Sequence, residues 1–170
     1  MEKIYGNVVD YRVYDDGKVC EGVTTVTLPD INHVISQISD AGMVMDVDYP
    51  DPTRFESMEF GVNHNNGVDC NRLCNPGRHE IETRVARNVY KTTEGEGDFE
   101  GMKVRIVGLH KSRTGGTIEA KNPYGSTDKY SVIRFEVEIG GEVVVLIDSS
   151  TGKVRINGQS QTDKVKSLIE

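Results

Sequence analysis

The sequence predicts a mainly β fold: a single-domain antiparallel β-barrel or sandwich with a short C-terminal helix and a long projecting loop or hairpin. Three observations predict it. Apolar residues at 133, 135, 137 and 139 alternate with polar ones, as in a strand with one buried and one wet face. Gly140-Gly141 suits a tight turn before the apolar run at 143–147. Near the start, Asp15-Asp16-Gly17 separates two apolar segments and predicts a β-hairpin.

Length and composition narrow the class of protein. The 170 residues suit one domain spanning 1–170, and a net charge of −7 argues against binding to a nucleic acid backbone. The three cysteines do not form an obvious disulfide framework, so we expect thiols. The sequence contains neither an apolar stretch long enough for a membrane span nor a signal-like start, so we expect folding in a cytoplasm.

The remaining elements follow from local patterns along the chain. Alternation and β-branched residues predict further strands at 8–14, 18–23, 23–28, 55–62 and 80–90. Pro29 is expected to end regular pairing. A loop with one helical turn near 68–73 is expected at 63–78, and a turn at 92–101. From residue 102 we expect a strand, a long polar loop, the long strand, two shorter strands and a helix, capped at 162 or 163, whose apolar stripe docks: Val165, Leu168 and Ile169.

Residues 30–53 carry conflicting patterns. Ile31, Val34, Ile35 and Ile38 lie at helical spacing, whereas residues 43–48 have the pattern of a strand. Pro50 and Pro52 are expected to bracket a turn. The segment is too long for an ordinary connection in a compact domain, which favours a projection.

Chemical motifs are sparse. His64, Cys70, Cys74 and His79 could supply a tetrahedral zinc set, although loop cysteines in such a protein are more often bystanders. His33 and His110 have no partner that the sequence identifies, and we expect both to be ordinary surface or loop residues. The basic cluster is expected to be a solvated face or a contact to an acidic neighbouring subunit; it comprises Lys103, Arg105, Lys111 and Arg113. No pattern calls for a nucleophile or a cofactor.

Two stretches carry a resemblance to a known family. Residues 11–29, YRVYDDGKVCEGVTTVTLP, and residues 130–158, with Gly140-Gly141 and Ile156-Asn157-Gly158, resemble in their order the phage major tail tube proteins of contractile tails, including those of phage-tail-like bacteriocins. The chain departs from the family where Ala41-Gly42-Met43 stands in place of a Gly-rich step, and in the Cys70 to Cys74 loop.

The resemblance implies a structural subunit and not an enzyme. Members form stacked, hexameric rings around a central channel, so the implied partners are further copies of this chain, the sheath protein, and baseplate and tail terminator proteins. DNA would cross the channel only if the particle is a phage. Assembly would take place in the bacterial host cytoplasm, giving a virion or a released extracellular particle with no membrane anchor.

The resemblance also suggests roles for particular residues. Carboxylates on wet strand faces would line an acidic lumen that repels a polyanion: Glu80, Glu82, Glu136 and Glu138. Residues 30–53 would form a projection that contacts the next ring or a neighbouring subunit, unless they fold back onto their own core. Contacts between copies would use apolar residues that a monomer exposes: Ile31, Val34, Ile35, Ile38, Met43, Met45, Val144 and Leu146.

Two other classes of function stay open at this stage. A soluble monomeric β-barrel that binds a small ligand predicts a stable monomer with a pocket. A hydrolase that uses a carboxylate pair such as Glu136 and Glu138 predicts a closed concave site, but carboxylates two apart on a strand are typical of any solvated face.

Overall fold

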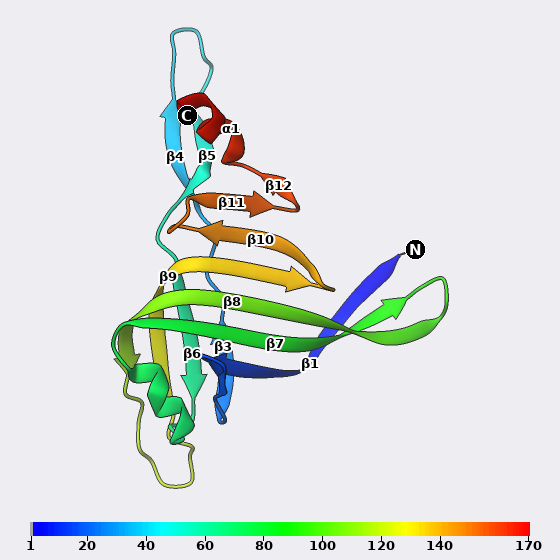
Figure 1. Ribbon diagram of the computed structural model, residues 1–170, viewed down its shortest axis with the longest axis vertical. Helices are drawn as coiled ribbons and strands as arrows, with labels where there is room; N and C mark the ends of the chain where they lie inside the picture. Colours follow the sequence, from blue (N-terminus) through cyan, green and yellow to red (C-terminus); the bar gives the residue numbers. More distant parts are fainter. Residues whose placement is uncertain (1) are drawn as a thin grey trace.

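A computed structural model describes residues 2–170 (Figure 1). Strands dominate its secondary structure, and two short helices complete it. In chain order the elements are β1 (Lys3–Asp15), β2 (Lys18–Val19), β3 (Val23–Thr27), β4 (His33–Ile38), β5 (Val47–Phe55), β6 (Glu59–His64), the 3-10 helix η1 (Asp69–Cys74), β7 (Arg78–Lys91), β8 (Glu96–Thr114), β9 (Ser126–Ile139), β10 (Glu142–Asp148), β11 (Lys153–Ile156), β12 (Gln159–Ser160) and α1 (Asp163–Ile169).

One large antiparallel sheet organises the molecule. Its ten strands run in the order β12-β11-β10-β9-β8-β7-β1-β2, and β3 joins through β6, which pairs with β9. Strand β9 therefore pairs with β10 along its second half and with β6 along its first half, so the sheet folds over its own core. Strands β4 and β5 form a separate two-stranded ribbon. The predicted mainly β antiparallel fold with a short C-terminal helix is confirmed.

The core lies between strands β7 to β11 of the large sheet and the strands β3 and β6, which the same sheet folds over them. A row of buried apolar residues crosses the sheet from β7 to β11, and each residue pairs with the next one across adjacent strands: Ile81, Ile106, Phe135, Ile147 and Val154. Phe60 and Val62 of β6 face this row and are fully buried. The predicted alternation is confirmed in β6 and in the second half of β9, where Phe135 and Val137 are the inward positions.

The first hairpin follows its sequence signal closely. Asp16 and Gly17 both have positive φ, 48° and 81°, as a tight primed turn between β1 and β2 requires. Strand β3 ends before Pro29, as expected. Strand β1 is longer than predicted, because pairing with β7 extends it back to Lys3.

Residues 30–53 contribute a hairpin, which we call the β4–β5 hairpin. The helical spacing in its first half is misleading, because that stretch is strand β4, paired from His33 with β5. β-branched residues favour strands, and a helix here would have no surface to pack on. The expected turn at Pro50 and Pro52 is also wrong. Both lie within β5, where an isolated ribbon tolerates prolines that a central strand would not.

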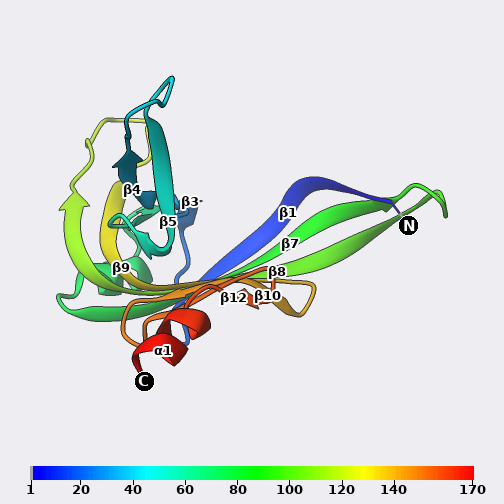
Figure 2. The same ribbon diagram turned by 90° about the horizontal axis from the view of Figure 1, so that it is seen from above.

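A second projection was not predicted from the sequence. Residues 3–10, 86–91 and 96–101 of β1, β7 and β8 form a three-stranded extension, which we call the arm; it leaves the body in Figure 2. The expected turn at 92–101 is confined to residues 92–95, because β8 already begins at Glu96. Gly97 and Gly101 have low strand propensity, so the sequence does not predict this part of β8 as a strand. Pairing with β7 outweighs that local preference.

The C-terminal helix forms as predicted, with Thr162 at its N-cap. Its apolar stripe, however, does not dock on this chain. Leu168 and Ile169 are 77% and 79% exposed, and Val165 is exposed as well. The helix follows closely after β12. Thr162 Oγ1 accepts a 3.4 Å hydrogen bond from the N–H of Val154 in β11, and this bond holds the helix at the sheet edge.

Gly108 is required where β8 and β9 shift register. A Cβ at this position would lie 2.8 Å from the Ser131 carbonyl oxygen and 3.2 Å from Tyr130 Cβ, both in a strand that has little freedom to move. We expect Gly108→Ala to lower the free energy of unfolding by about 1–3 kcal/mol through overpacking. Gly101→Ala in the same strand is the matched control, because nothing lies within 4 Å of its Cβ. Equal denaturant midpoints for the two variants would contradict this explanation.

Candidate functional site

The surface opposite the core is a lattice of charged side chains on β7, β8, β9 and β10, which we call the charged face. Its central row pairs Glu82 with Arg105 and Arg105 with Glu136 across adjacent strands. The Arg105 guanidinium lies 3.2 Å from a carboxylate oxygen of Glu136 and 3.2 Å from one of Glu138. Arg134 also contacts Glu136, at 3.1 Å. Acidic and basic groups therefore alternate along and across the strands.

All four carboxylates predicted to face a lumen lie on this face, on β7 and β9: Glu80, Glu82, Glu136 and Glu138. Their surroundings are not simply acidic, because strand β8 inserts Lys103 and Arg105 between them. The sequence alone assigns these two basic residues to a separate cluster. Alternation with period 2 in adjacent antiparallel strands is the sequence signal that places these acidic and basic residues on the same face of the sheet.

Glu82 on the charged face is held in its ionised form by a neighbouring base. A hydrogen bond from Arg84, 3.0 Å from Nε to Oε1, is the main cause that lowers the pKa of Glu82 below its ordinary value. Because Arg84 and Glu82 are partly exposed, solvent screens this pair and it contributes little to stability.

Strand β10 adds an apolar strip to the same face. Leu146 opposes Glu136 across the β9–β10 pair, and both Leu146 and Val144 are half-buried. Its other side packs on the core through Val145 and Ile147. The prediction that β10 is apolar on both sides, with one side on the core, agrees with this geometry. The strip borders a hollow of about 540 Å³ between β10 and β11.

A buried polar cluster lies at the far end of the sheet from the arm. Asp128 is completely buried and accepts hydrogen bonds from His64 Nε2 at 2.6 Å, His110 Nε2 at 3.0 Å, and Arg113 Nε and Nη2 at 2.9 Å each. Burial opposes ionisation of this carboxyl, but the bonds from Arg113, His110 and His64 outweigh it and lower the pKa of Asp128. Arg113 also holds η1, through the Asn71 side chain at 3.1 Å.

Two sequence-based expectations are corrected by this cluster. His110 is not an ordinary surface residue, because it bonds Asp128, and Arg113 is not a solvated base. Asp128 itself escapes prediction from the sequence. The available signal is its place in β9, where Ser126, Asp128 and Tyr130 alternate as buried residues.

The four residues considered for zinc do not converge. His64 bonds Asp128, and His79 lies 3.1 Å from an Asp15 carboxylate oxygen. Cys70 donates its Sγ–H to the Glu21 carbonyl at 2.8 Å. Burial is the main cause that raises the pKa of Cys70 to about 11, so this thiol stays protonated and is a poor metal ligand at neutral pH.

Among the described residues, Cys74, His110 and Asp128 do offer ligand atoms within 4.8 Å of one another. The donor set nevertheless fits a metal badly. Both carboxylate oxygens of Asp128 already accept from Arg113, so a cation would have to displace a guanidinium or bind beside it. The arrangement is better suited to anchoring β6, β8, β9 and η1 to one another.

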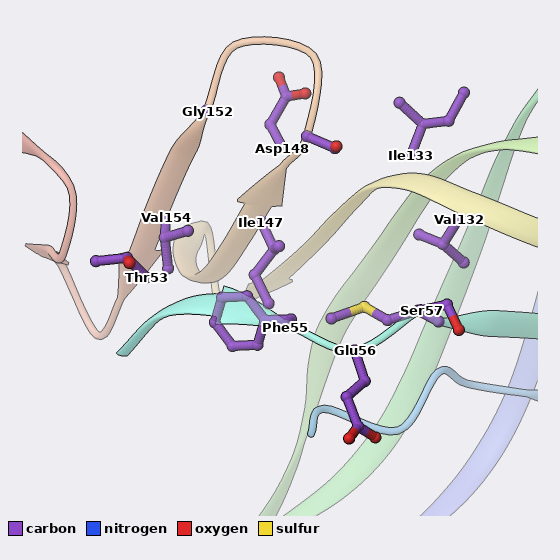
Figure 3. A pocket seen from close by; sticks show the side chains of 12 residues that line it. Thr53, Phe55, Glu56, Ser57, Val132, Ile133, Ile147, Asp148, Gly152 and Val154 are labelled. Carbon is purple, nitrogen blue, oxygen red and sulfur yellow. The ribbon is translucent and has the colours of Figure 1, made fainter. Parts of the chain in front are cut away.

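A hollow of about 310 Å³ opens between the end of β5 and strands β9 to β11 (Figure 3). Phe55, Ile147 and Val154 point toward one another in it, whereas the Glu56 side chain points away. Asp148 at its rim is occupied by hydrogen bonds from Ser150, 2.9 Å from the N–H and 2.6 Å from the hydroxyl. The lining is about half polar, and the volume lies at the lower end of the range for ligand pockets.

The β4–β5 hairpin exposes most of its apolar residues. Ile38 and Val47 oppose each other on one side with Tyr49, and all three are exposed. The other apolar side chains predicted to make contacts in this segment are likewise exposed: Ile31, Val34, Ile35, Met43 and Met45. They do not fold back onto the chain's own core.

Comparisons with known proteins agree with this architecture. In the described residues no helix combines the length and apolarity needed to cross a membrane. The family model described as phage tail tube protein FII matches residues 7–169. A search of curated protein sequences finds no significant match.

A similar solved structure belongs to a contractile particle. It is the cryo-EM structure of an extracellular contractile injection system, a PVC sheath-tube complex in its extended state. The TM-score is 0.53 at 11% sequence identity, covering 75% of this chain and 87% of the other, so the likeness concerns the fold. Because the family model covers almost the whole chain, this protein belongs to the phage tail tube protein FII family.

Proposed function

We propose that the chain is the structural subunit of the inner tube of a contractile phage tail or phage-tail-like particle, with a structural and not a catalytic role. Copies assemble into hexameric rings, and the rings stack around a central channel. The family membership supports a tube subunit, and the similar solved structure is a complex of a tube with a sheath. By analogy, the sheath protein is the partner on the outside.

The observation that carries the proposal is an open sheet with one uncovered face. In the described residues, β1 pairs on one side with β7 and on the other only at Tyr14 and Asp15, so most of that edge is unpaired. The opposite edge ends in β11 and the two-residue strand β12. Unpaired edges of this length favour addition of another strand, and the partner that every ring supplies is the next copy.

Joined edge to edge, six sheets present the charged face to the channel. Glu82, Arg105 and Glu136 then recur around the lumen. Their mutual pairing leaves little net charge to hold a passing molecule, whether a polyanion or a protein. DNA passes only if the particle is a phage tail. From the family alone we infer that assembly takes place in the host cell, and that baseplate and tail terminator proteins bind the two ends of the tube.

The β4–β5 hairpin is proposed to contact the neighbouring copy within a ring. Figure 1 shows it projecting past β11 and β12, across the strand direction, which is the direction in which the next sheet would be added. Its exposed Ile38, Val47 and Tyr49 would be buried there. The strip at Val144 and Leu146 borders the same edge.

Light scattering on the purified protein, with negative-stain electron microscopy, tests the proposal. We expect the mass of a six-chain ring or its multiples, and hollow particles of uniform diameter. A protein that stays monomeric at high concentration, also when seeded with tail baseplates, would contradict it. Saturable binding of a small molecule in the hollow of Figure 3 by such a monomer would instead favour a ligand-binding module.

A further inference from the structure

The direction of the arm relative to the sheet has a consequence for assembly. Where copies join through their sheet edges, backbone hydrogen bonds run around the ring and the strands cross the ring. An element that lengthens the strands therefore projects out of the ring, toward the ring above or below. The arm is such an element, because it continues β1, β7 and β8 (Figure 2).

The arm is long compared with the rest of the sheet. Strand β8 has 19 residues and β7 has 14, whereas β10 has 7. At about 3.3 Å per residue, the six residues 96–101 carry the arm about 20 Å beyond Met102.

In the arm, uncharged and apolar side chains replace the charged ones along the side of the strands that continues the charged face. The positions that continue Glu82 and Arg84 along β7 are Asn88 and Tyr90, and Tyr90 opposes Ile4 on β1. Phe99 of β8 lies opposite Asn88 and is 69% exposed. We call Ile4, Tyr90 and Phe99 the arm patch. They border a hollow of about 410 Å³ to which Gly6 and Gly97 contribute no side chain.

The opposite end of the same strands exposes a large apolar side chain in each of two loops. Strand β7 is preceded by the loop that contains η1, and β8 is followed by the loop at 115–125, so both loops lie at the far end from the arm tip (Figure 1). Val68 and Ile118 in these loops are 88% and 82% exposed. Arg113 fixes the first loop through Asn71, which gives this loop end a defined shape.

We propose that the arm of each copy packs its arm patch against the loop end, Val68 and Ile118, of a copy in the next ring. The occupant of the arm patch is therefore a second copy of this chain. This inference rests on the proposed tube function and adds the surfaces that join one ring to the next. The contact is heterologous, so it does not close on itself and propagates into a filament with two different ends.

Phe99→Asp tests the arm directly. Because Phe99 is largely exposed in the monomer, we expect less than about 0.5 kcal/mol change in stability, and rings that form but do not stack. Phe99→Leu, which keeps an apolar side chain, is the matched control and should give tubes of normal length. Electron microscopy counts rings and measures tube lengths.

A mixing experiment tests the pairing of the two surfaces. Val68→Asp combined with Ile118→Asp should also give unstacked rings. Preformed Phe99→Asp rings retain an intact loop end, and the double-variant rings retain an intact arm patch. When the two kinds of ring are mixed, we expect pairs of rings to form, and no stack of more than two rings.

Two results separate the possible failures. Tubes of normal length from Phe99→Asp, or no ring pairs in the mixture, would overturn the assignment of the arm while leaving the tube function standing. Absence of rings from the unmodified chain, also on baseplate seeds, would instead overturn the proposed function itself.

Discussion

Replacing Asp128 with asparagine is expected to lower the free energy of unfolding by about 3–5 kcal/mol, because it leaves buried donors without their counter-charge. Asp128 is fully buried and receives four hydrogen bonds from His64, His110 and Arg113. For a chain of 170 residues this corresponds to a fall of about 10 °C in the midpoint of thermal unfolding. Calorimetry of monomeric protein at neutral pH measures it.

Asp46→Asn is the matched control, because Asp46 is exposed in the β4–β5 hairpin. It should leave the unfolding midpoint within about 1–2 °C of the unmodified chain. If Asp128→Asn were as stable as this control, the polar cluster would not be a structural anchor, and coordination by Cys74 and His110 would need to be reconsidered.

The same cluster predicts a pH dependence. The pKa of Asp128 is lowered in the folded state, so its contribution to stability is present above its unfolded pKa of about 4 and is lost as the pH falls through the lower folded value. The unmodified protein should therefore lose stability below about pH 4 more steeply than Asp128→Asn. Parallel acid unfolding curves for the two would contradict this assignment.

Ile38→Ser in the β4–β5 hairpin is expected to block ring formation while leaving the monomer folded. Burying an isoleucine side chain contributes about 1.5–3 kcal/mol, and a ring repeats the contact at every interface. The concentration required for assembly should rise by at least about tenfold, since 1.4 kcal/mol corresponds to a factor of ten. Sedimentation velocity over a concentration series measures the change.

Gln37→Ser is its matched control. Gln37 neighbours Ile38 but points to the opposite side of the ribbon, where it opposes Asp48. Assembly at the unmodified concentration is expected for this control. Loss of rings in both variants would indicate a general weakness of the hairpin, and loss in neither would show that this surface is free in the tube.

Much of the fold could be predicted because local signals and tertiary structure agree. The alternation in β9, the Gly140-Gly141 turn and the Asp15-Asp16-Gly17 turn each specify period, length and direction within a few residues. The carboxylates on β7 and β9 could be placed on one face for the same reason, since strand periodicity requires only the strand itself.

The remaining features depend on pairing between distant residues. The arm exists because β1, β7 and β8 extend one another, although Gly97 and Gly101 disfavour a strand locally. The hairpin strand β4 is likewise set by its partner β5, against the helical spacing of its isoleucines. The cluster at Asp128 joins residues up to 64 positions apart, which no local pattern reports.

A helical reconstruction of the assembled particle by electron microscopy tests the central claim most directly. We predict that the sheets of successive copies join edge to edge around a channel lined by Glu82, Arg105 and Glu136. The same map should show the β4–β5 hairpin on the neighbour within a ring and the arm on the next ring. A map in which the charged face points outward, or in which the lumen is lined by other elements, would contradict the account.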